Sequence, residues 1–532
     1  MKLHTFLFFC LTVSLEAASR PNIVFILADD LGIGDVKCYG GERSLIETPN
    51  IDRLAREGLR FTDAHVQASV CVPTRVAIMT GRYPWRFGPP QRGGPWGFLG
   101  PRFDTDTFTL GKLFRAAEYR TGYVGKWHLG TRMVTKDGKE QGPSNVNYSK
   151  PITVGPLQHG FDKSFILPGS LDMYPYAYVR NNVWQGDVSA QKGWSAFNRV
   201  GPAEKDFEDH EVIETLYGEA ENFIGNQSVN QPFFFLALTA PHTPTSPGKA
   251  WLGKSNLGVY GDFVMEVDSA VTRVRAALAR QQLTDNTLIL FASDHGAAPY
   301  AGNILKATPN QLRLLEKKGH YSSGAYRGYK FSVYEGGLRV PLIAHWPGVI
   351  GAGGTNDSLV GLCDLVATFA DLAGIDLDLE QAPDSVSFAR LLTDSGAKGA
   401  RQNLIMQSIG PFVVRDGDWK LCLCPGSGSH LEHGNTPRRD DAWRKSLRKF
   451  GKVPTWKDLS RAPFVQLFNL ADDPHEDRNL AAQESKRVDQ MVALLRQQVS
   501  SGRSTPGPGI NPERSRININ QRLPDFVRKL LK

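Results

Sequence analysis

Four mainly apolar runs along the chain each end abruptly in polar residues. Short, nearly continuous apolar runs are typical of strands that are buried on both faces of a largely parallel sheet. The runs span Ile23–Ala28, Thr121–Val124, Phe233–Leu238 and Leu288–Ala292. Segments between them have helical patterns, notably Thr109–Glu118 and Phe263–Leu278. This alternation predicts an α/β fold with a central sheet flanked by helices.

The polar residues that follow these runs are expected to gather on one rim of the sheet. In open sheets of this kind, ligands bind beyond the carboxyl ends of the strands. Each residue has an ordinary alternative as a loop or capping residue, but the coincidence of so many favours a shared site. The residues concerned are Asp29, Asp30, Lys126, His128, His242, Asp294 and His295.

The segment Cys71-Val72-Pro73-Thr74-Arg75 is the most informative short stretch of the sequence. The pattern of Thr74–Thr80 predicts the first turns of a helix, and Gly81 stands where such a helix can end. Cys71 would then lie at or just before the helix N-terminus, where backbone N–H groups and the helix dipole favour a developing negative charge. A lone cysteine can equally be a small buried apolar residue.

After about residue 400 the pattern changes to shorter strands. We expect strands at Asn403–Ile409, Phe412–Arg415, Trp419–Cys422 and Val465–Leu470, with a turn at Asp416-Gly417 and a helix through Val488–Val499. These elements predict a small antiparallel sheet with one long helix packed on it. We therefore divide the chain into a signal peptide (1–19), a catalytic domain (20–400) and a C-terminal subdomain with a tail (401–532).

Length and composition fit an exported globular protein. The chain has 532 residues, 41% of them hydrophobic and 22% charged, so long disordered segments are not indicated. The first nineteen residues combine a basic start, a short apolar run and small residues before the mature chain, as in a secretory signal peptide. We expect a periplasmic or extracellular protein, or a lysosomal one in a eukaryote, with no membrane span and no nucleic acid partner. The net charge of +8 mildly favours anionic substrates.

Four cysteines remain once Cys10 and Cys71 are set aside. In an oxidising compartment one disulfide among Cys38, Cys363, Cys422 and Cys424 is expected, although their spacing does not assign a pair.

The Cys71-x-Pro73-x-Arg75 pattern resembles the signature of the type I sulfatases, members of the alkaline phosphatase superfamily. In that family the cysteine is oxidised after translation to formylglycine, whose hydrate is the nucleophile. The resemblance extends over almost the whole chain, through Pro21-Asn22-Ile23, His159-Gly160-Phe161-Asp162, Tyr334-Glu335-Gly336-Gly337, Leu467-Phe468-Asn469-Leu470 and Asp473-Pro474. It implies an alkaline-phosphatase-like sandwich with a largely parallel central sheet and a smaller C-terminal antiparallel sheet.

The resemblance also implies a role for each residue of the site. Catalytic roles fall to Cys71 as formylglycine, Arg75 holding its hydrate, His128 removing a proton from that hydrate, and His242 protonating the departing alcohol. Lys126 and Lys330 would hold sulfate oxygens. Calcium, or magnesium, would be bound by Asp29, Asp30, Asp294, His295 and residue 71. Hard cations prefer such oxygen ligands, whereas the His295 imidazole is a softer one.

The substrate is the least determined property. Two segments, Trp85–Trp96 and Met173–Trp184, are rich in aromatic and arginine residues that bind anionic sugars or simply pack in a core. The basic run Arg438–Lys457 could likewise contact a sulfated polymer or be a solvated surface. We expect an exo-acting carbohydrate sulfatase, matured by a formylglycine-generating or anaerobic enzyme. The alternatives are a phosphatase or phosphodiesterase of the same superfamily and a non-catalytic binder of sulfated glycans.

Overall fold

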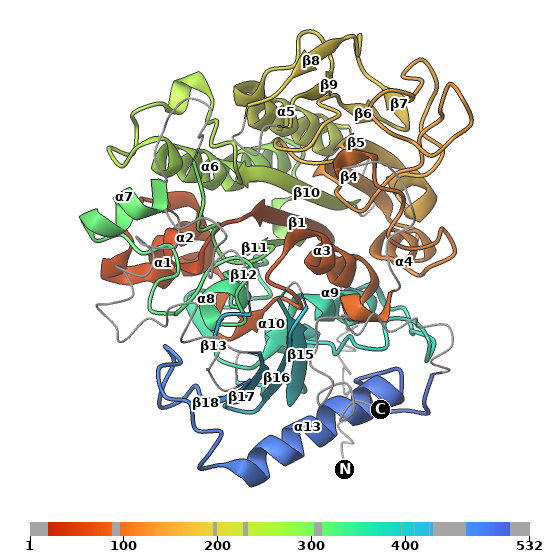
Figure 1. Ribbon diagram of the computed structural model, residues 1–532. Helices are drawn as coiled ribbons and strands as arrows, with labels where there is room; N and C mark the ends of the chain where they lie inside the picture. The colour runs from red at the N-terminus through yellow and green to blue at the C-terminus, as the bar shows by residue number, and fades with distance from the viewer. Residues whose placement is uncertain are drawn as a thin grey trace, which may run out of the picture.

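The computed structural model describes residues 20–87, 96–194, 199–226, 232–302, 311–394, 396–408, 410–424, 426–428 and 464–510. The expected signal peptide and the basic run Arg438–Lys457 lie outside these residues. Within them the chain forms a large central sheet with helices on both faces, and a smaller sheet beside it (Figure 1).

The central sheet has ten strands in the order β13-β2-β12-β11-β1-β10-β4-β5-β6-β7. Its middle is parallel, since β1 pairs in parallel with both β10 and β11, and β4 pairs in parallel with β10 and β5. Antiparallel strands lie on either side, at β12 and at β6 and β7. The bounds are β1 Asn22–Asp29, β2 Leu59–Phe61, β4 Arg120–Lys126, β5 Lys163–Leu167, β6 Val179–Arg180, β7 Val183–Trp184, β10 Pro232–Pro241, β11 Thr287–Ser293, β12 Leu342–His345 and β13 Gly354–Asn356.

The four strands predicted from apolar runs are therefore confirmed as β1, β4, β10 and β11. Every residue of β1 and β11 is buried, as continuous apolar strands between two helical layers require. The α/β prediction is confirmed with them. The antiparallel strands at the sides of the sheet were not predicted, because runs of two to four residues carry too little periodicity to be recognised.

Two separate hydrophobic cores lie on the two faces of this sheet. One face is covered by α3, α4 and α9, and the other by α2, α5 and α6 (Figure 1). The helices are α1 Lys37–Gly40, α2 Pro49–Glu57, α3 Cys71–Thr80, α4 Leu110–Ala116, α5 Val212–Gly225, α6 Val259–Arg280, α7 Gln311–Lys318, α8 Glu335–Leu338, α9 Leu365–Ala373, α10 Ala389–Thr393 and α13 Ser485–Ser500. Because helices cover both faces of the sheet, the polar residues that follow the strands lie at the strand ends, on one rim of the sheet.

The predicted C-terminal sheet is also confirmed. It has four antiparallel strands in sequence order, β15 Asn403–Gln407, β16 Phe412–Asp416, β17 Trp419–Leu423 and β18 Val465–Asn469. Helix α13 lies along this sheet (Figure 1), and its buried residues Met491, Leu495 and Val499 belong to the same core as α3 and α9. The division of the chain at residue 400 stays a prediction. The described residues also form two short two-stranded sheets, β3 Ala64–His65 with β14 Val360–Gly361 and β8 Ala190–Lys192 with β9 Gly201–Ala203.

Buried charges join the C-terminal sheet to the loop that carries Lys330. Lys420 Nζ lies 2.8 Å from Glu335 Oε1 and 2.8 Å from Glu476 Oε1. His65 Nε2 lies 2.9 Å from Glu335 Oε2, and Glu335 begins α8, five residues after Lys330. Removing one member of such a buried network leaves an uncompensated charge. The network therefore fixes the position of the Lys330 loop relative to the small sheet.

The expected disulfide is wrong for the cysteines that the structure describes. Cys38, Cys71, Cys363, Cys422 and Cys424 form no disulfide with one another. All but Cys38 are buried; Cys422 lies on β17, and Cys424 directly follows that strand. Side-chain packing in the core, rather than cross-linking, accounts for Cys363, Cys422 and Cys424.

Glu266 of α6 is a buried carboxyl group whose titration gives a stability prediction. Burial raises the pKa of Glu266 to about 8, although its Oε2 accepts a hydrogen bond from the Gly248 N–H at 2.9 Å. Because the folded state binds this proton more tightly than the unfolded state, the contribution of Glu266 to stability is fully present below about pH 4.5 and is lost as the pH rises through about 8. Glu266→Gln keeps an oxygen acceptor and stays neutral at every pH.

We therefore expect Glu266→Gln to unfold at a denaturant concentration similar to the parent at pH 5. At pH 9 the variant should exceed the parent by on the order of 1–3 kcal/mol in free energy of unfolding. Urea titrations at both pH values measure this difference, provided that both proteins unfold in one reversible step. A difference between the two proteins that does not grow with pH would contradict the assignment.

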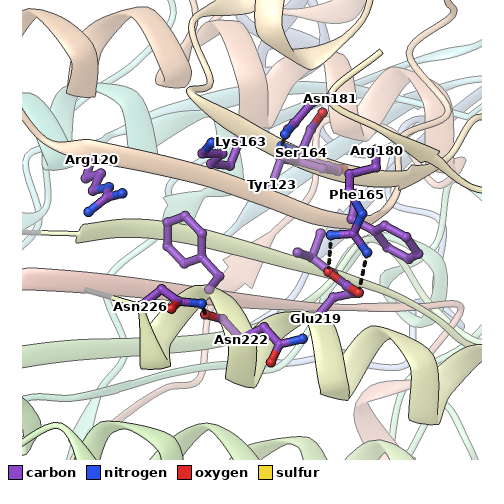
Figure 2. A pocket seen from close by; sticks show the side chains of 12 residues that line it. Arg120, Tyr123, Lys163, Ser164, Phe165, Arg180, Asn181, Glu219, Asn222 and Asn226 are labelled. Carbon is purple, nitrogen blue, oxygen red and sulfur yellow. Dashed lines mark hydrogen bonds and ion pairs between the residues drawn. The ribbon is translucent and has the colours of Figure 1, made fainter. Parts of the chain in front are cut away.

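A pocket of about 170 Å³ opens at the amino ends of β4 and β5, next to α5 (Figure 2). The polar rim predicted from the sequence is at the opposite, carboxyl ends of these strands. None of the helices in the described ranges combines the length and hydrophobicity that a membrane span requires.

Candidate active site

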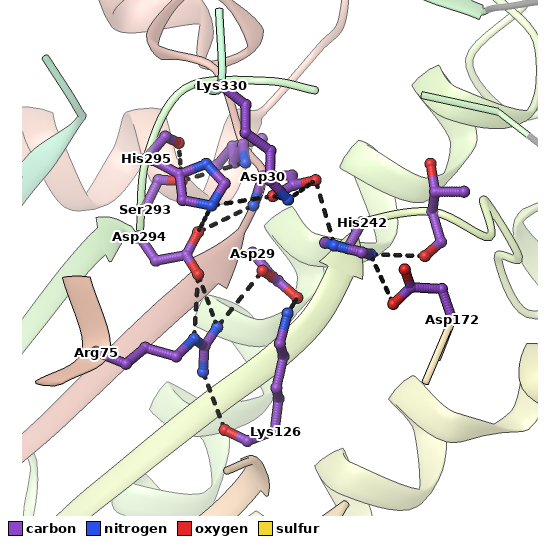
Figure 3. Close-up of polar contacts among 12 residues, drawn as sticks. Asp29, Asp30, Arg75, Lys126, Asp172, His242, Ser293, Asp294, His295 and Lys330 are labelled. Atoms are coloured by element: carbon purple, nitrogen blue, oxygen red, sulfur yellow. Dashed lines mark hydrogen bonds and ion pairs between the residues drawn. The ribbon is translucent and has the colours of Figure 1, made fainter. Parts of the chain in front are cut away.

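The predicted rim residues come together at the carboxyl ends of the parallel strands (Figure 3). Asp29 ends β1 and Asp30 follows it, Lys126 ends β4, His242 follows β10, and Asp294 and His295 follow β11. Two residues come from outside the strand ends, Arg75 from α3 and Lys330 from the loop before α8. All of these side chains are buried.

Three carboxylates and one imidazole form a cluster that suits a divalent cation. Ligand atoms of Asp29, Asp30, Asp294 and His295 all lie within 4.8 Å of one another. Burial raises the pKa of Asp30 well above its ordinary value, and the charges of Asp29 and Asp294 add to this against the effect of Lys330. Burial likewise raises the pKa of Asp294 to about 6. A cation held among these groups would offset their mutual repulsion.

The hydrogen bond of the His295 ring leaves its Nε2 atom available to bind a metal. His295 Nδ1 lies 2.9 Å from the carbonyl oxygen of Gly296, so Nδ1 carries the proton and donates it. Nε2 points toward Asp30 Oδ1 at 3.2 Å and Asp294 Oδ1 at 3.4 Å, and has no hydrogen-bond donor of its own. Asp29 Oδ1 is also buried without a hydrogen bond. Both unpartnered atoms fit a role as ligands, with the Gly296 carbonyl orienting the ring.

Three cationic side chains surround the carboxylates. Lys126 Nζ lies 2.6 Å from Asp29 Oδ2, and Lys330 Nζ lies 2.7 Å from Asp30 Oδ1. Arg75 donates from Nε to Asp294 Oδ2 at 3.1 Å and from Nη1 to the Lys126 carbonyl oxygen at 2.9 Å. Despite burial, which lowers it, the pKa of Lys126 is raised by Asp29, so the ammonium group stays charged. The site thus presents fixed positive charges to an anionic substrate.

Cys71 is the first residue of α3 and lies in this site. Its side chain is 5% exposed. Burial opposes ionisation, but the Lys126 and Lys330 ammonium groups and the neighbouring His295 ring outweigh it and lower the pKa of Cys71 to about 7. Helix α3 extends from Cys71 to Thr80 and ends at Gly81 in the left-handed conformation, as the sequence predicted. Arg75, one turn further along, faces Asp29 and Asp294.

His242 and its partner Asp172 stand on the other side of Asp30. His242 Nδ1 donates to the Thr243 carbonyl oxygen at 2.6 Å, so Nε2, which lies 3.6 Å from Asp30 Oδ2, is the nitrogen available for proton exchange. Asp172 Oδ1 lies 3.9 Å from Nδ1 and has no hydrogen bond of its own, while its Oδ2 is 2.7 Å from Arg199 Nη1. Burial and the positive charges of Lys330 and Lys126 lower the pKa of His242 well below its ordinary value, against the effects of Asp29 and of the hydrogen bond to Thr243. An anion bound between the two lysines would offset their charges and so favour the protonated ring.

His128 completes the set near Lys126. Burial and the positive charges of Lys126 and Arg75 lower the pKa of His128 well below its ordinary value, which leaves the imidazole neutral and able to accept a proton. Its Nδ1 is buried without a hydrogen-bond partner. His128 has φ 53°, a left-handed conformation that turns the chain sharply after β4.

Sequence reasoning missed three residues at this site. Asp172 faces His242, Tyr300 has its ring 5.8 Å from Lys330 Nζ, and burial lowers the pKa of Arg102 to about 10 while the Cys71 charge opposes this. None of them follows one of the predicted strands, so their positions depend on loop conformations. Asp172 lies shortly after β5. A prediction of β5 as a fifth parallel strand would have placed Asp172 near the rim, but this strand was not predicted from the sequence.

Aromatic residues of the two segments predicted to bind sugars lie in the core instead of at the site. Trp85 is 3% exposed and packs against Tyr83 and Phe412, and Tyr176 is 1% exposed, so these aromatic residues belong to the core. Arg180 forms an ion pair with Glu219 in the pocket at the amino ends of β4 and β5, away from the site. Residues 88–95 lie outside the described residues. The packing alternative is therefore the correct one for Trp85 and Tyr176.

Comparison with known proteins agrees with the geometry of the site. The Sulfatase family model matches residues 21–375, which include every predicted site residue. This chain belongs to the sulfatase family. It is therefore a sulfuric ester hydrolase of the alkaline phosphatase superfamily.

Individual sulfatases are similar along most of the chain. The N-acetylgalactosamine-6-O-sulfatase of Bacteroides thetaiotaomicron is 28% identical, covering 90% of this chain and 93% of that protein. Arylsulfatase A of Bos taurus is 31% identical, covering 94% and 93%. The human N-acetylgalactosamine-6-sulfatase is 32% identical, but covers 70% of this chain and 65% of its own length.

Solved structures support the same fold. A Bacteroides thetaiotaomicron sulfatase from work on the metabolism of multiple glycosaminoglycans superimposes with a TM-score of 0.73 at 27% identity, covering 90% of this chain and 99% of that one. The protein Ps i-CgsB in complex with k-i-k-neocarrahexaose gives a TM-score of 0.66 at 25% identity, covering 96% and 100%. The phosphonate monoester hydrolase of Agrobacterium radiobacter, with a TM-score of 0.54 at 18% identity, shares the fold alone.

Proposed function

We propose that this sulfatase uses formylglycine derived from Cys71 and a divalent cation, calcium or magnesium, held by Asp29, Asp30, Asp294 and His295. The observation that carries the proposal is one juxtaposition: Cys71 begins a helix beside His295, and two lysines flank the buried carboxylates. The cation, when bound, would neutralise charge on the sulfate oxygens. A maturation enzyme, aerobic or anaerobic, would supply the oxidation of the thiol.

The residues of this chain would then divide the work of sulfate transfer. Lys126 and Lys330 bind the sulfate oxygens and lower the repulsion between the ester and an anionic nucleophile. Arg75, fixed by Asp294 and by the Lys126 carbonyl, orients residue 71. The sulfur–oxygen bond to the alcohol breaks as residue 71 attacks, and the alcohol oxygen takes a proton from His242. His128 then removes the proton of the second hydroxyl on residue 71, which expels sulfate and restores the aldehyde.

The role of His242 as the acid predicts a dependence on the leaving group. His242→Gln should reduce kcat/KM by about 10²- to 10⁴-fold for sulfate esters of sugar alcohols, whose leaving oxygen must be protonated. Activated aryl esters, such as 4-nitrophenyl sulfate, should lose less than about tenfold. Steady-state kinetics on both substrate types measure the two ratios. His345→Gln, at a histidine outside the site, is the matched control.

Equal losses on alkyl and aryl esters would show that His242 positions the substrate rather than donating a proton. A general loss of folding is recognised by thermal unfolding of each variant. The same kinetic panel tests the reaction itself, because turnover of sulfate esters is what the family membership requires.

We further propose sulfated carbohydrates as the substrate class, with removal of a sulfate from the chain end. Two relatives are named for N-acetylgalactosamine 6-sulfate, and one structural neighbour was solved in complex with k-i-k-neocarrahexaose. We propose that the protein meets these polar, anionic sugars after export, as the signal-peptide pattern of the first nineteen residues predicts. A panel of sulfated mono- and oligosaccharides tests this proposal. Turnover restricted to small aryl sulfates would overturn it.

A further inference from the structure

The pocket at the amino ends of β4 and β5 lies far from the catalytic rim. Arg120 begins β4 and lines the pocket, whereas Lys126 ends the same strand inside the active site. At about 3.3 Å per residue, these two positions are roughly 20 Å apart along the strand. The pocket is therefore separate from the site of sulfate ester cleavage.

The lining combines positive charge with hydroxyl- and amide-bearing side chains (Figure 2). Three cationic side chains and one carboxylate line it, so the lining has a net charge of +2. Arg180 is neutralised by Glu219 through two hydrogen bonds of 2.7 and 2.6 Å. Arg120 and Lys163 are exposed and form no ion pair within the described part of the chain. Two cations are thus available to a bound anion.

A buried hydroxyl without a partner also lines this pocket. Ser164 is 5% exposed, and its Oγ makes no hydrogen bond although its backbone N–H donates to Asn181 Oδ1 at 2.8 Å. A buried polar atom is normally satisfied by protein, water or ligand. Asn222 and Asn226, both exposed on α5 or just after it, add amide groups that can donate and accept. Such paired donors and acceptors suit sugar hydroxyl groups.

An aromatic ring lies on the strand at the same place. A Cβ atom at Gly122 would lie 2.3 Å from the Phe223 ring, so glycine at this position lets the half-buried ring rest directly on β4. Phe223 also stacks on Phe234 with ring centroids 4.9 Å apart, which fixes its orientation. Flat aromatic surfaces next to polar groups are favourable contacts for the apolar face of a sugar ring.

We propose that this pocket binds an anionic sugar unit of a polysaccharide and so holds a polymer on the enzyme away from the catalytic rim. Its volume of about 170 Å³ exceeds that of an inorganic anion, and its mixed lining fits a ring with hydroxyl groups and one negative charge. The claim that this polymer is also the substrate rests on the function proposed above. The claim that the pocket binds the polymer does not.

Binding is best measured with the full chain carrying Cys71→Ala, which prevents turnover. Isothermal titration or affinity electrophoresis would use dextran sulfate, polygalacturonate and unsulfated dextran as probes at constant salt. We expect Arg120→Ala/Lys163→Ala in this background to weaken binding of an anionic polymer about tenfold, which is about 1.4 kcal/mol. Lys254→Ala/Lys486→Ala, which removes two exposed cations outside the pocket, should change it less than twofold.

The two anionic probes distinguish sulfate from carboxylate recognition, and tight binding of either one supports the proposal. Equal binding by the pocket variant and its parent would overturn it. So would an equal loss in the Lys254/Lys486 control, or binding of neutral dextran as tight as that of the anionic polymers.

A separate kinetic measurement keeps this result distinct from the proposed function. With Cys71 retained, Arg120→Ala/Lys163→Ala should cleave 4-nitrophenyl sulfate at the parental rate and unfold at the parental Tm. Absence of sulfatase activity in every protein would overturn the proposed function while leaving the binding comparison intact.

Discussion

Replacing Cys71 with alanine is expected to reduce kcat on every sulfate ester by on the order of 10⁴-fold or more, with the fold intact. The side chain occupies little volume at the first turn of α3, and its partners, Lys126, Lys330 and His295, keep their other contacts. Kinetics together with thermal unfolding measure the two parts of this prediction.

Cys38→Ala is the matched control, because Cys38 is a half-buried thiol on α1, away from the rim. It should retain parental activity. Cys71→Ser separates the two halves of the reaction, since serine can attack sulfur but has no second hydroxyl to expel sulfate. We expect it to become sulfated once and stop. Full multiple-turnover activity of either Cys71 variant would contradict the assigned nucleophile.

Removal of the divalent cation is expected to lower activity about 100-fold or more and to lower the Tm as well. The buried carboxyl groups of Asp29, Asp30 and Asp294 repel one another, and the cation offsets this repulsion in the folded state alone. Dialysis against a chelator, followed by return of Ca²⁺ or Mg²⁺, should restore both properties. Thermal unfolding at increasing ion concentration gives the readout that does not depend on turnover.

Asp294→Asn is the informative variant for this site. It retains the size of the side chain and an oxygen that can accept from Arg75, but removes one negative charge from the cluster. Its Tm should respond to Ca²⁺ at a higher concentration than the parental Tm does. The metal site would be contradicted if neither the Tm nor the activity of the parental protein changed on addition of a chelator or of cations.

The parallel core of the fold and the catalytic rim could be predicted because one physical rule governs both. Strands such as β1 and β11 are buried on both faces, so their apolar runs are continuous and their ends are marked by polar residues. The carboxyl ends of parallel strands share one edge, so strand direction alone is enough to bring Asp29, Lys126 and Asp294 together. Helix α3 was equally predictable, since Gly81 ends it.

The contributions of loops and sheet edges could not be predicted from pattern alone. Asp172 reaches His242 from a turn after β5, a strand of five residues that begins with an exposed lysine. The pairing of β12 with β2 is antiparallel and short, so no periodic pattern marked it. The two aromatic segments were over-interpreted in the opposite direction. Their aromatic and arginine residues are of the kinds that bind sugars, but Trp85 and Tyr176 pack in the core.

Mass spectrometry of the peptide that contains residue 71 tests the central claim most directly. Active enzyme from a host with a competent maturation system should show the loss of mass that replaces the CH₂SH side chain with an aldehyde, and that peptide should react with a hydrazide. Fully active enzyme in which residue 71 remains a thiol that iodoacetamide alkylates would contradict the account.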